Sequence, residues 1–152
     1  MQQAELKDII TEWLPGATFD ENGQWLNVNV EPKDLHLLAV KLRNHEHTQF
    51  DYCFCLTCVD WKTHLTMVYH LDSTKFRHQV VVKVKLDAAK PEVETVSDLW
   101  KTADFHEREV YEMFGVHFIN HPDLRLLILP DGWEGKNPLR KNFEDPINMI
   151  KL

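Results

Sequence analysis

Glycine is scarce in this chain, with 5 among 152 residues. Phosphate-cradling loops such as G-x-G-x-x-G and the Walker motif need closely spaced glycines, and neither motif occurs. The nucleophile elbow G-x-S-x-G is missing, and so is the zinc-binding H-E-x-x-H spacing. The sequence therefore lacks the common signatures of nucleotide-binding proteins, α/β-hydrolases and zinc proteases.

Long apolar runs and an excess of positive charge are missing as well. The longest apolar stretches, such as 80–82 and 126–130, fall far short of the ~20 residues that cross a bilayer. The net charge is -7, from 24 acidic and 17 basic side chains. Nucleic acid is therefore a poor partner, and no basic amphipathic stretch suits a lipid surface. We expect any membrane association to go through a partner protein.

Cysteine is confined to one short segment, at Cys53, Cys55 and Cys58. An odd number of cysteines after a polar, signal-free start favours reduced thiols in a cytoplasmic compartment. Three thiolates can hold zinc or an iron–sulfur cluster, with His64 or His70 as a fourth ligand. The segment favours the alternative of core cysteines in a strand. In that strand Cys53 and Cys55 face one side and Cys58 the other, because side chains alternate.

Hydrophobic periodicity predicts an α+β domain over residues 1–115. Helical spacing and end signals predict helices over 4–14, 32–45, 95–100 and 103–114. The third of these rests on Thr95-Val-Ser-Asp98, which resembles a capping box. Alternation predicts strands over 17–19, 25–30, 50–59, 64–71 and 78–86. The order α-β-β-α-β-β-β-α-α indicates two layers, with one mixed, mainly antiparallel sheet and helices on one face.

Residues 116–152 have a different composition, with four prolines, two glycines and no steady period. This pattern predicts an extended, irregular C-terminal arm. Its large apolar residues are Leu124, Leu126, Leu127, Ile128, Leu129, Trp133, Leu139 and Phe143. Such a segment either covers its own domain or lies on another protein, and composition leaves both open. Without a partner, we expect the arm to be partly mobile or to self-associate.

The helix predicted over 103–114 is rich in charge. Asp104 and Glu107 lie near its start, where negative charge is favoured. Arg108 and Glu112 are four residues apart, so they can pair on one helix face. Arginines of the arm, such as Arg125, can form bidentate bridges to carboxylates.

A longer pattern joins this helix to the arm. It consists of Glu-Arg-Glu, a later acid, two apolar residues, two spaced basic residues and an apolar pair. Here these are Glu107, Arg108, Glu109, Glu112, Met113, Phe114, His121, Arg125, Leu127 and Ile128. With the segments 130–135, 138–141, 56–61 and 68–71, the pattern resembles the C-type subunit family of complex I, also called the thirty-kilodalton subunit. Two departures are Lys136-Asn137, which lengthens one link by a residue, and Asn142, where the family commonly has Asp.

The resemblance implies a structural subunit of a respiratory NADH:quinone oxidoreductase. Such an assembly passes electrons from NADH to quinone, including ubiquinone, and pumps protons. The resemblance further implies that the chain has no catalytic, cofactor-binding or metal-binding residue, and that flavin and iron–sulfur clusters lie in partner subunits. It implies packing against the hydrogenase-like large subunit (the D type) and the B-type subunit, peripherally on the cytoplasmic face of a bacterial inner (cell) membrane.

On this resemblance, ten residues are expected to meet the partner or to organise the arm. They are Glu107, Arg108, Glu109, Glu112, His121, Asp123, Arg125, Trp133, Arg140 and Lys141. One alternative is the equivalent subunit of a membrane-bound hydrogenase or of a quinone oxidoreductase with another donor. Others are a stand-alone metal or redox protein that uses the three cysteines and His70, and a free-standing enzyme with a deep pocket at the acids of the 107–112 stretch.

Overall fold

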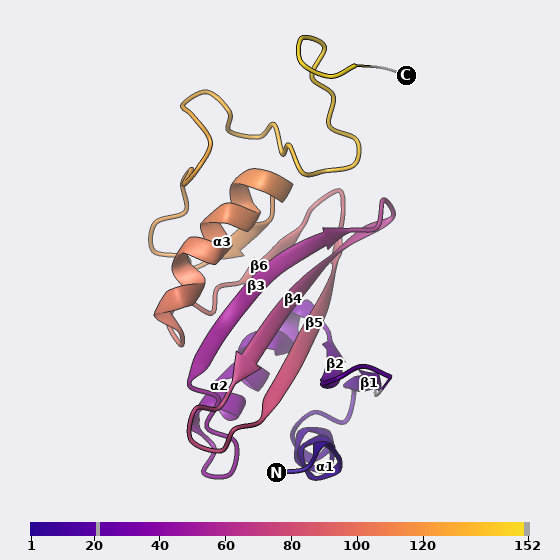
Figure 1. Ribbon diagram of the computed structural model, residues 1–152, viewed down its shortest axis with the longest axis vertical. Coiled ribbons are helices and arrows are strands. Elements are labelled where there is room, and N and C mark those ends of the chain that lie inside the picture. The colour runs from indigo at the N-terminus through magenta and orange to yellow at the C-terminus, as the bar shows by residue number, and fades with distance from the viewer. Residues whose placement is uncertain (21, 151–152) are drawn as a thin grey trace.

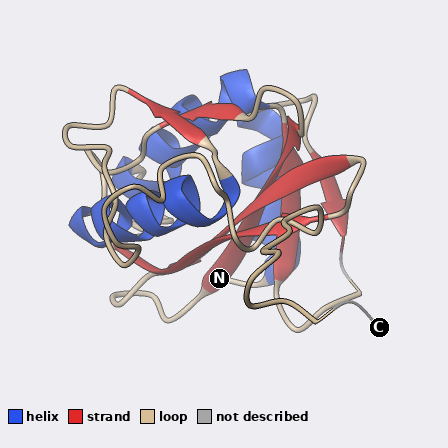
Figure 2. Ribbon diagram, turned by 90° about the horizontal axis from the view of Figure 1, so that it is seen from above, coloured by secondary structure: helices blue, strands red, loops and turns tan. Residues whose placement is uncertain are grey.

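A five-stranded sheet carries the helices on one of its faces in the computed structural model, which describes residues 1–20 and 22–150 (Figure 1, Figure 2). The helices are α1 (Gln3–Trp13), α2 (Leu35–Asn44) and α3 (Lys101–Phe114), with a 3-10 turn η1 (Pro32–Asp34) leading into α2. The sheet strands are β1 (Thr18–Asp20), β2 (Leu26–Val30), β3 (Tyr52–Asp60), β4 (His64–Asp72) and β5 (Gln79–Asp87). The α+β class predicted from the sequence is confirmed.

The strands follow the order β1-β2-β5-β4-β3. β2 and β5 run parallel, and the other neighbours are antiparallel. Two short strands, β6 (Glu92–Glu94) and β7 (His117–Ile119), form a separate parallel pair. Within the described residues, no helix is both long and apolar enough to cross a membrane.

Alternation along the strands places the core between the sheet and the helices. In β5, the alternating residues Val80, Val82, Val84 and Leu86 are all buried on that face. The opposite face is lined by aromatic rings. The His70 ring makes an edge contact with the Trp25 ring and a tilted contact with the Phe54 ring, each at a centroid distance of 5.6 Å. None of the three helices in the described part of the chain covers this second face (Figure 2).

The expected alternation of the cysteines is wrong because β3 contains a bulge. The pairing register with β4 shifts between Cys53 and Cys55, so one extra residue enters the strand. As a result Cys53 and Cys58 both lie on the buried face, 0% and 5% exposed, and Cys55 is only half-buried. Burial raises the pKa of both the Cys53 and the Cys58 thiol to about 12.

The short helix predicted over 95–100 is also wrong. Residues 92–94 form β6, and a turn follows in which the Leu99 N–H donates to the Val96 carbonyl. The Thr95 hydroxyl accepts the N–H of Ser97, two residues on, at 3.1 Å. This is the local turn that Ser and Thr side chains form in competition with a helix. The partner of β6 is β7, which lies at the start of the segment predicted to be an irregular arm.

Gly115 ends α3, as the sequence indicates. Its φ is +75° and its N–H donates to the Tyr111 carbonyl at 2.9 Å, which is the usual left-handed helix end. A Cβ at this position would lie 2.7 Å from the Asn137 side chain. The Asn137 side chain of the arm therefore packs against Gly115, and a Cβ at this position would require that side chain to shift.

We predict that Gly115→Ala destabilises the fold by more than about 2 kcal/mol, because left-handed backbone strain and a steric clash add. Gly132→Ala isolates the strain, since Gly132 has a φ of +88° and open space around it. Gly16→Ala controls for both, having neither feature. Urea unfolding would give the three free energies of unfolding, and equal losses for Gly115→Ala and Gly132→Ala would contradict the close approach.

Candidate functional site

Three charged side chains of α3 are buried, which is unusual for Glu and Arg. Glu107 is 0% exposed, Glu112 is 1% and Arg108 is 5%. Burying a charge is costly unless hydrogen bonds replace the lost water. All three side chains therefore need polar partners from other parts of the chain.

Glu112 binds the backbone of the arm. Its carboxylate accepts the N–H groups of Leu127, Ile128 and Leu129, at 2.8, 2.9 and 3.1 Å respectively. Consecutive backbone N–H groups that converge on one anion form a compact binding nest. The carboxylate thus fixes the path of three successive arm residues.

Arg108 binds the two residues that precede this nest. Its Nε donates to the Arg125 carbonyl at 3.1 Å, and its Nη2 donates to the Leu126 carbonyl at 2.6 Å. Its guanidinium carbon lies 5.4 Å from the centre of the Phe105 ring. The spacing allowed Arg108 to pair with Glu112, but each of the two charged side chains binds the arm instead. We call this set of contacts between Arg108, Glu112 and residues 125–129 the α3 clamp.

Glu107 binds the turn that enters α3. Its carboxylate accepts the Thr95 hydroxyl and, at 2.8 Å, the Val96 N–H. Burial raises the pKa of Glu107 to about 7, and these two hydrogen bonds oppose the shift only in part. The Nε2 of His121 lies 3.7 Å from the same carboxylate. Glu107 thus holds together the turn, the helix and the first residues after β7.

His121 sits over the first turn of α3. Its side chain is 1% exposed. Its Nδ1 accepts the Asp123 N–H at 3.1 Å, so Nε2 carries the proton. Nε2 lies 3.2 Å from the Asp104 carbonyl oxygen, to which it donates. The predicted role of His121 in organising the arm thus has a geometric basis.

Arg140 and Lys141 attach a later part of the arm to the domain by hydrogen bonds. Arg140 donates from Nε to the Phe114 carbonyl at 2.6 Å and from Nη1 to the Ala88 carbonyl at 3.1 Å. A cation is favoured at this position because helix carbonyls are unpaired at the C-terminus. The Lys141 N–H donates to Asp60 Oδ2 at 2.8 Å. The arm is therefore fastened to α3 and to the end of the sheet as well.

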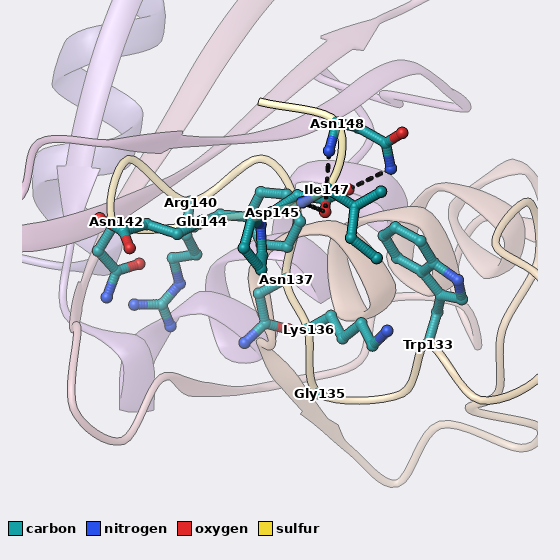
Figure 3. A pocket seen from close by; sticks show the side chains of 12 residues that line it. Trp133, Gly135, Lys136, Asn137, Arg140, Asn142, Glu144, Asp145, Ile147 and Asn148 are labelled. Carbon is teal, nitrogen blue, oxygen red and sulfur yellow. Dashed lines mark hydrogen bonds between the residues drawn. The ribbon is translucent and has the colours of Figure 1, made fainter. Parts of the chain in front are cut away.

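The side chains of the remaining expected residues lie outside these contacts. Glu109 is exposed on α3. Asp123 and Arg125 pair with each other at 2.9 Å on the surface. Trp133 lines an open hollow of about 750 Å³ formed by the arm alone, with the Lys136 ammonium 4.4 Å from its ring centre (Figure 3). Arg140 and Asn142 lie at the other end of this hollow.

Two residues that take part in these contacts, Asp60 and Thr95, were not predicted from the sequence. Asp60 lies in the 56–61 segment that carries the family resemblance, but nothing in the sequence showed that it would receive the arm. Thr95 was interpreted as a helix cap, so its role as a donor to Glu107 was hidden. Both partners are distant in the sequence, and only the folded chain brings them together.

The suggested metal ligands are not brought together. Cys53 and Cys58 point into the core, whereas His70 lies among the rings on the opposite face of the sheet. Across residues 1–20 and 22–150, no group of three or more His, Cys, Asp or Glu side chains has a metal-binding arrangement. The described residues thus do not bring the suggested cysteine and histidine ligands into one site.

The α3 clamp lies inside a stretch that matches a known family. Residues 28–146 match the model of the family described as respiratory-chain NADH dehydrogenase, 30 Kd subunit. The chain belongs to this family. The match covers every residue of the clamp and the fastening points of the arm at Arg140 and Lys141.

Curated relatives of this 30 Kd family member are complex I subunits. The chain is 41% identical over 127 residues to the NADH-quinone oxidoreductase C/D subunit of Phocaeicola vulgatus, a match that covers 82% of this chain and 24% of the relative. It is 40% identical over 109 residues to the C-type NADH-quinone oxidoreductase subunit of Chloroherpeton thalassium, a match that covers 70% of this chain and 45% of the relative. The chain thus spans less than half the length of these relatives.

Solved structures share the fold. The chain aligns with a chain in the structure of the membrane-bound sulfane sulfur reductase, an archaeal respiratory membrane complex. The TM-score is 0.80 and the identity 27%, over 93% of this chain and 85% of the other. It also aligns with a trypsin-resistant fragment (1-134) of Nqo5, with a TM-score of 0.66 and 27% identity, over 78% of this chain and 98% of the fragment.

We predict that Glu112→Gln destabilises the protein by about 2–3 kcal/mol, because three N–H groups of the arm lose a charged acceptor. Glu109→Gln is the matched control, since it changes the same residue type on the exposed face of the same helix. Its effect should stay within about 0.5 kcal/mol. Urea unfolding measures both, and protease cleavage between residues 120 and 140 should accelerate only in Glu112→Gln. Equal behaviour of the two variants would rule out the clamp.

Glu107 should make stability depend on pH. Its folded-state pKa, about 7, lies above the ordinary value of 4.5, so the protonated carboxyl favours the folded state. This contribution is present below about pH 4.5 and is lost as the pH rises through about 7, for a total of ~3 kcal/mol. Glu107→Gln removes this titration. Between about pH 4.5 and 7, the wild type should therefore lose free energy of unfolding relative to Glu107→Gln. Parallel pH profiles would contradict the raised pKa.

Proposed function

We propose that this chain is a non-catalytic peripheral-arm subunit of a respiratory NADH:quinone oxidoreductase. It docks onto the hydrogenase-like large subunit and adjoins the B-type subunit. In this role it supports electron transfer from NADH to quinone and the coupled translocation of protons. The flavin and iron–sulfur clusters are held by partner subunits, and the assembly lies on the cytoplasmic face of the membrane.

The proposal rests on the exposed apolar side chains of the arm. Its backbone is held by buried charges of α3, while several of its apolar side chains face outward. Leu139 is 55% exposed, Ile128 is 63% and Ile147 is 89%. A segment that is fixed in its path and apolar on its outer side suits a permanent protein contact.

The relatives support the hydrogenase-like large subunit, the D type, as the partner. The Phocaeicola vulgatus relative is named as a joint C/D subunit, and this chain matches 24% of it. A protein whose name joins the two subunits in one chain is consistent with a direct contact between them. The exposed arm supplies a surface for that contact.

A second candidate is the equivalent subunit of a respiratory membrane complex with another electron donor or acceptor. The observation that favours it is the alignment with the archaeal sulfane sulfur reductase complex, with a TM-score of 0.80 over 93% of this chain. The two candidates share the same structural role and differ in the redox partners held by other subunits.

The test is purification of the tagged chain from detergent-solubilised membranes of its host. Mass spectrometry should find the hydrogenase-like large subunit, and the eluate should reduce quinone with NADH. Recovery of that subunit without NADH-dependent activity would favour the second candidate. Recovery of the chain alone would contradict both.

We predict that Leu139→Ser lowers the recovery of partner subunits by about tenfold or more, since burying a leucine side chain contributes roughly 2 kcal/mol. Leu37→Ser is the matched control, because Leu37 lies on α2 and is 52% exposed, close to the 55% of Leu139. It should leave recovery unchanged. Thermal unfolding of both isolated variants checks that folding is intact, and equal recovery would remove the arm from the interface.

A further inference from the structure

A second hollow, of about 470 Å³, opens where the arm meets the end of the sheet. It lies between the β3–β4 turn, the loop after β5 and arm residues 140–142. Its charged lining residues are Lys62, Arg140, Lys141 and Asp60, with the amide of Asn142 beside them. Three cations and one anion leave this hollow positive, although the whole chain carries a net charge of -7.

Asp60 positions the cations without neutralising the hollow. Its Oδ1 accepts the Lys62 N–H at 2.7 Å, and its Oδ2 accepts the Lys141 N–H at 2.8 Å. One carboxylate therefore anchors the backbones of both lysines. These N–H donors lower the pKa of Asp60, so it stays ionised at neutral pH and keeps the anchor.

Arg140 is held by its other contacts. Its Nε and Nη1 donate to the carbonyls of Phe114 and Ala88, which leaves the other N–H groups of the guanidinium for a further acceptor. The side chains of Lys62 and Lys141 are exposed, and in the described part of the chain neither forms an ion pair. The hollow thus presents unpaired positive charge on a fixed backbone.

We propose that this hollow receives the Asp or Glu side chains of an acidic segment on a partner protein. The proposal rests on the proposed function, because it gives the chemistry of one contact in that assembly. Charge complementarity selects carboxylates, and guanidinium–carboxylate pairs are strong when bidentate. The apolar neighbours favour a protein segment over a free anion. Trp61, next to Lys62, is 56% exposed, and Leu139, next to Arg140, is 55% exposed, a composition typical of interfaces.

Zero-length carbodiimide coupling of the purified assembly tests the contact, because it joins a lysine amine to a carboxylate only when the two touch. We expect Lys62 or Lys141 to be joined to an Asp or Glu of another chain, as read by mass spectrometry. In parallel, Lys62→Gln/Lys141→Gln should lower the recovery of partner subunits at least fivefold. This loss should shrink at high salt, where wild-type recovery also falls.

The matched control is Lys33→Gln/Lys101→Gln, which removes the same charge from two exposed lysines that do not line the hollow. It should retain wild-type recovery. Equal recovery of the two double variants, or an assembly whose other lysines couple between chains while Lys62 and Lys141 do not, would overturn the proposal and leave the proposed function standing. Recovery of the chain alone would overturn both.

A free anion is the remaining outcome. Calorimetry with inorganic phosphate on the isolated chain would then show binding that Lys62→Gln/Lys141→Gln abolishes, with no coupling of these lysines to another chain. That result would assign the hollow to a small anion and overturn docking.

Discussion

The carboxylate of Glu112 receives three consecutive backbone N–H groups of the arm, and the course of the arm depends on it. An irregular segment has no ladder to satisfy its N–H and C=O groups, so it must find partners elsewhere. Glu112 supplies the acceptor, and Arg108, one helical turn earlier, supplies donors for the preceding carbonyls. The hydrogen bonds offset the cost of burying both charges.

This arrangement explains why the arm is at once attached and apolar on the outside. Because polar side chains of the domain hold its backbone, its own apolar side chains are not all needed to attach it. Ile128 combines both features, because its N–H donates to Glu112 while its side chain is 63% exposed. The sequence left open whether the arm covers its own domain or serves a partner. The clamp accounts for the first role, and the exposed side chains are the basis of the proposed second role.

Periodicity predicted the helices and the long strands because burial of one face leaves a regular trace in the sequence. It failed where pairing is short or irregular. β6 and β7 have three residues each, and α3 separates them in the sequence. The bulge in β3 leaves no pattern in the sequence that alternation can detect. Spacing on α3 singled out Arg108 and Glu112. It could not identify their partners, because helix geometry shows which side chains share a face and not what a later segment brings to them.

Amide hydrogen exchange of the isolated chain, read at Leu127, Ile128 and Leu129, measures whether the α3 clamp holds the arm. If the α3 clamp holds the arm without a partner, these three amides exchange at least about 100-fold slower than in an unstructured peptide, since they open only with the clamp. Exchange at the unstructured rate in a folded chain would contradict this account, and would show that the arm takes its course only when another protein covers it.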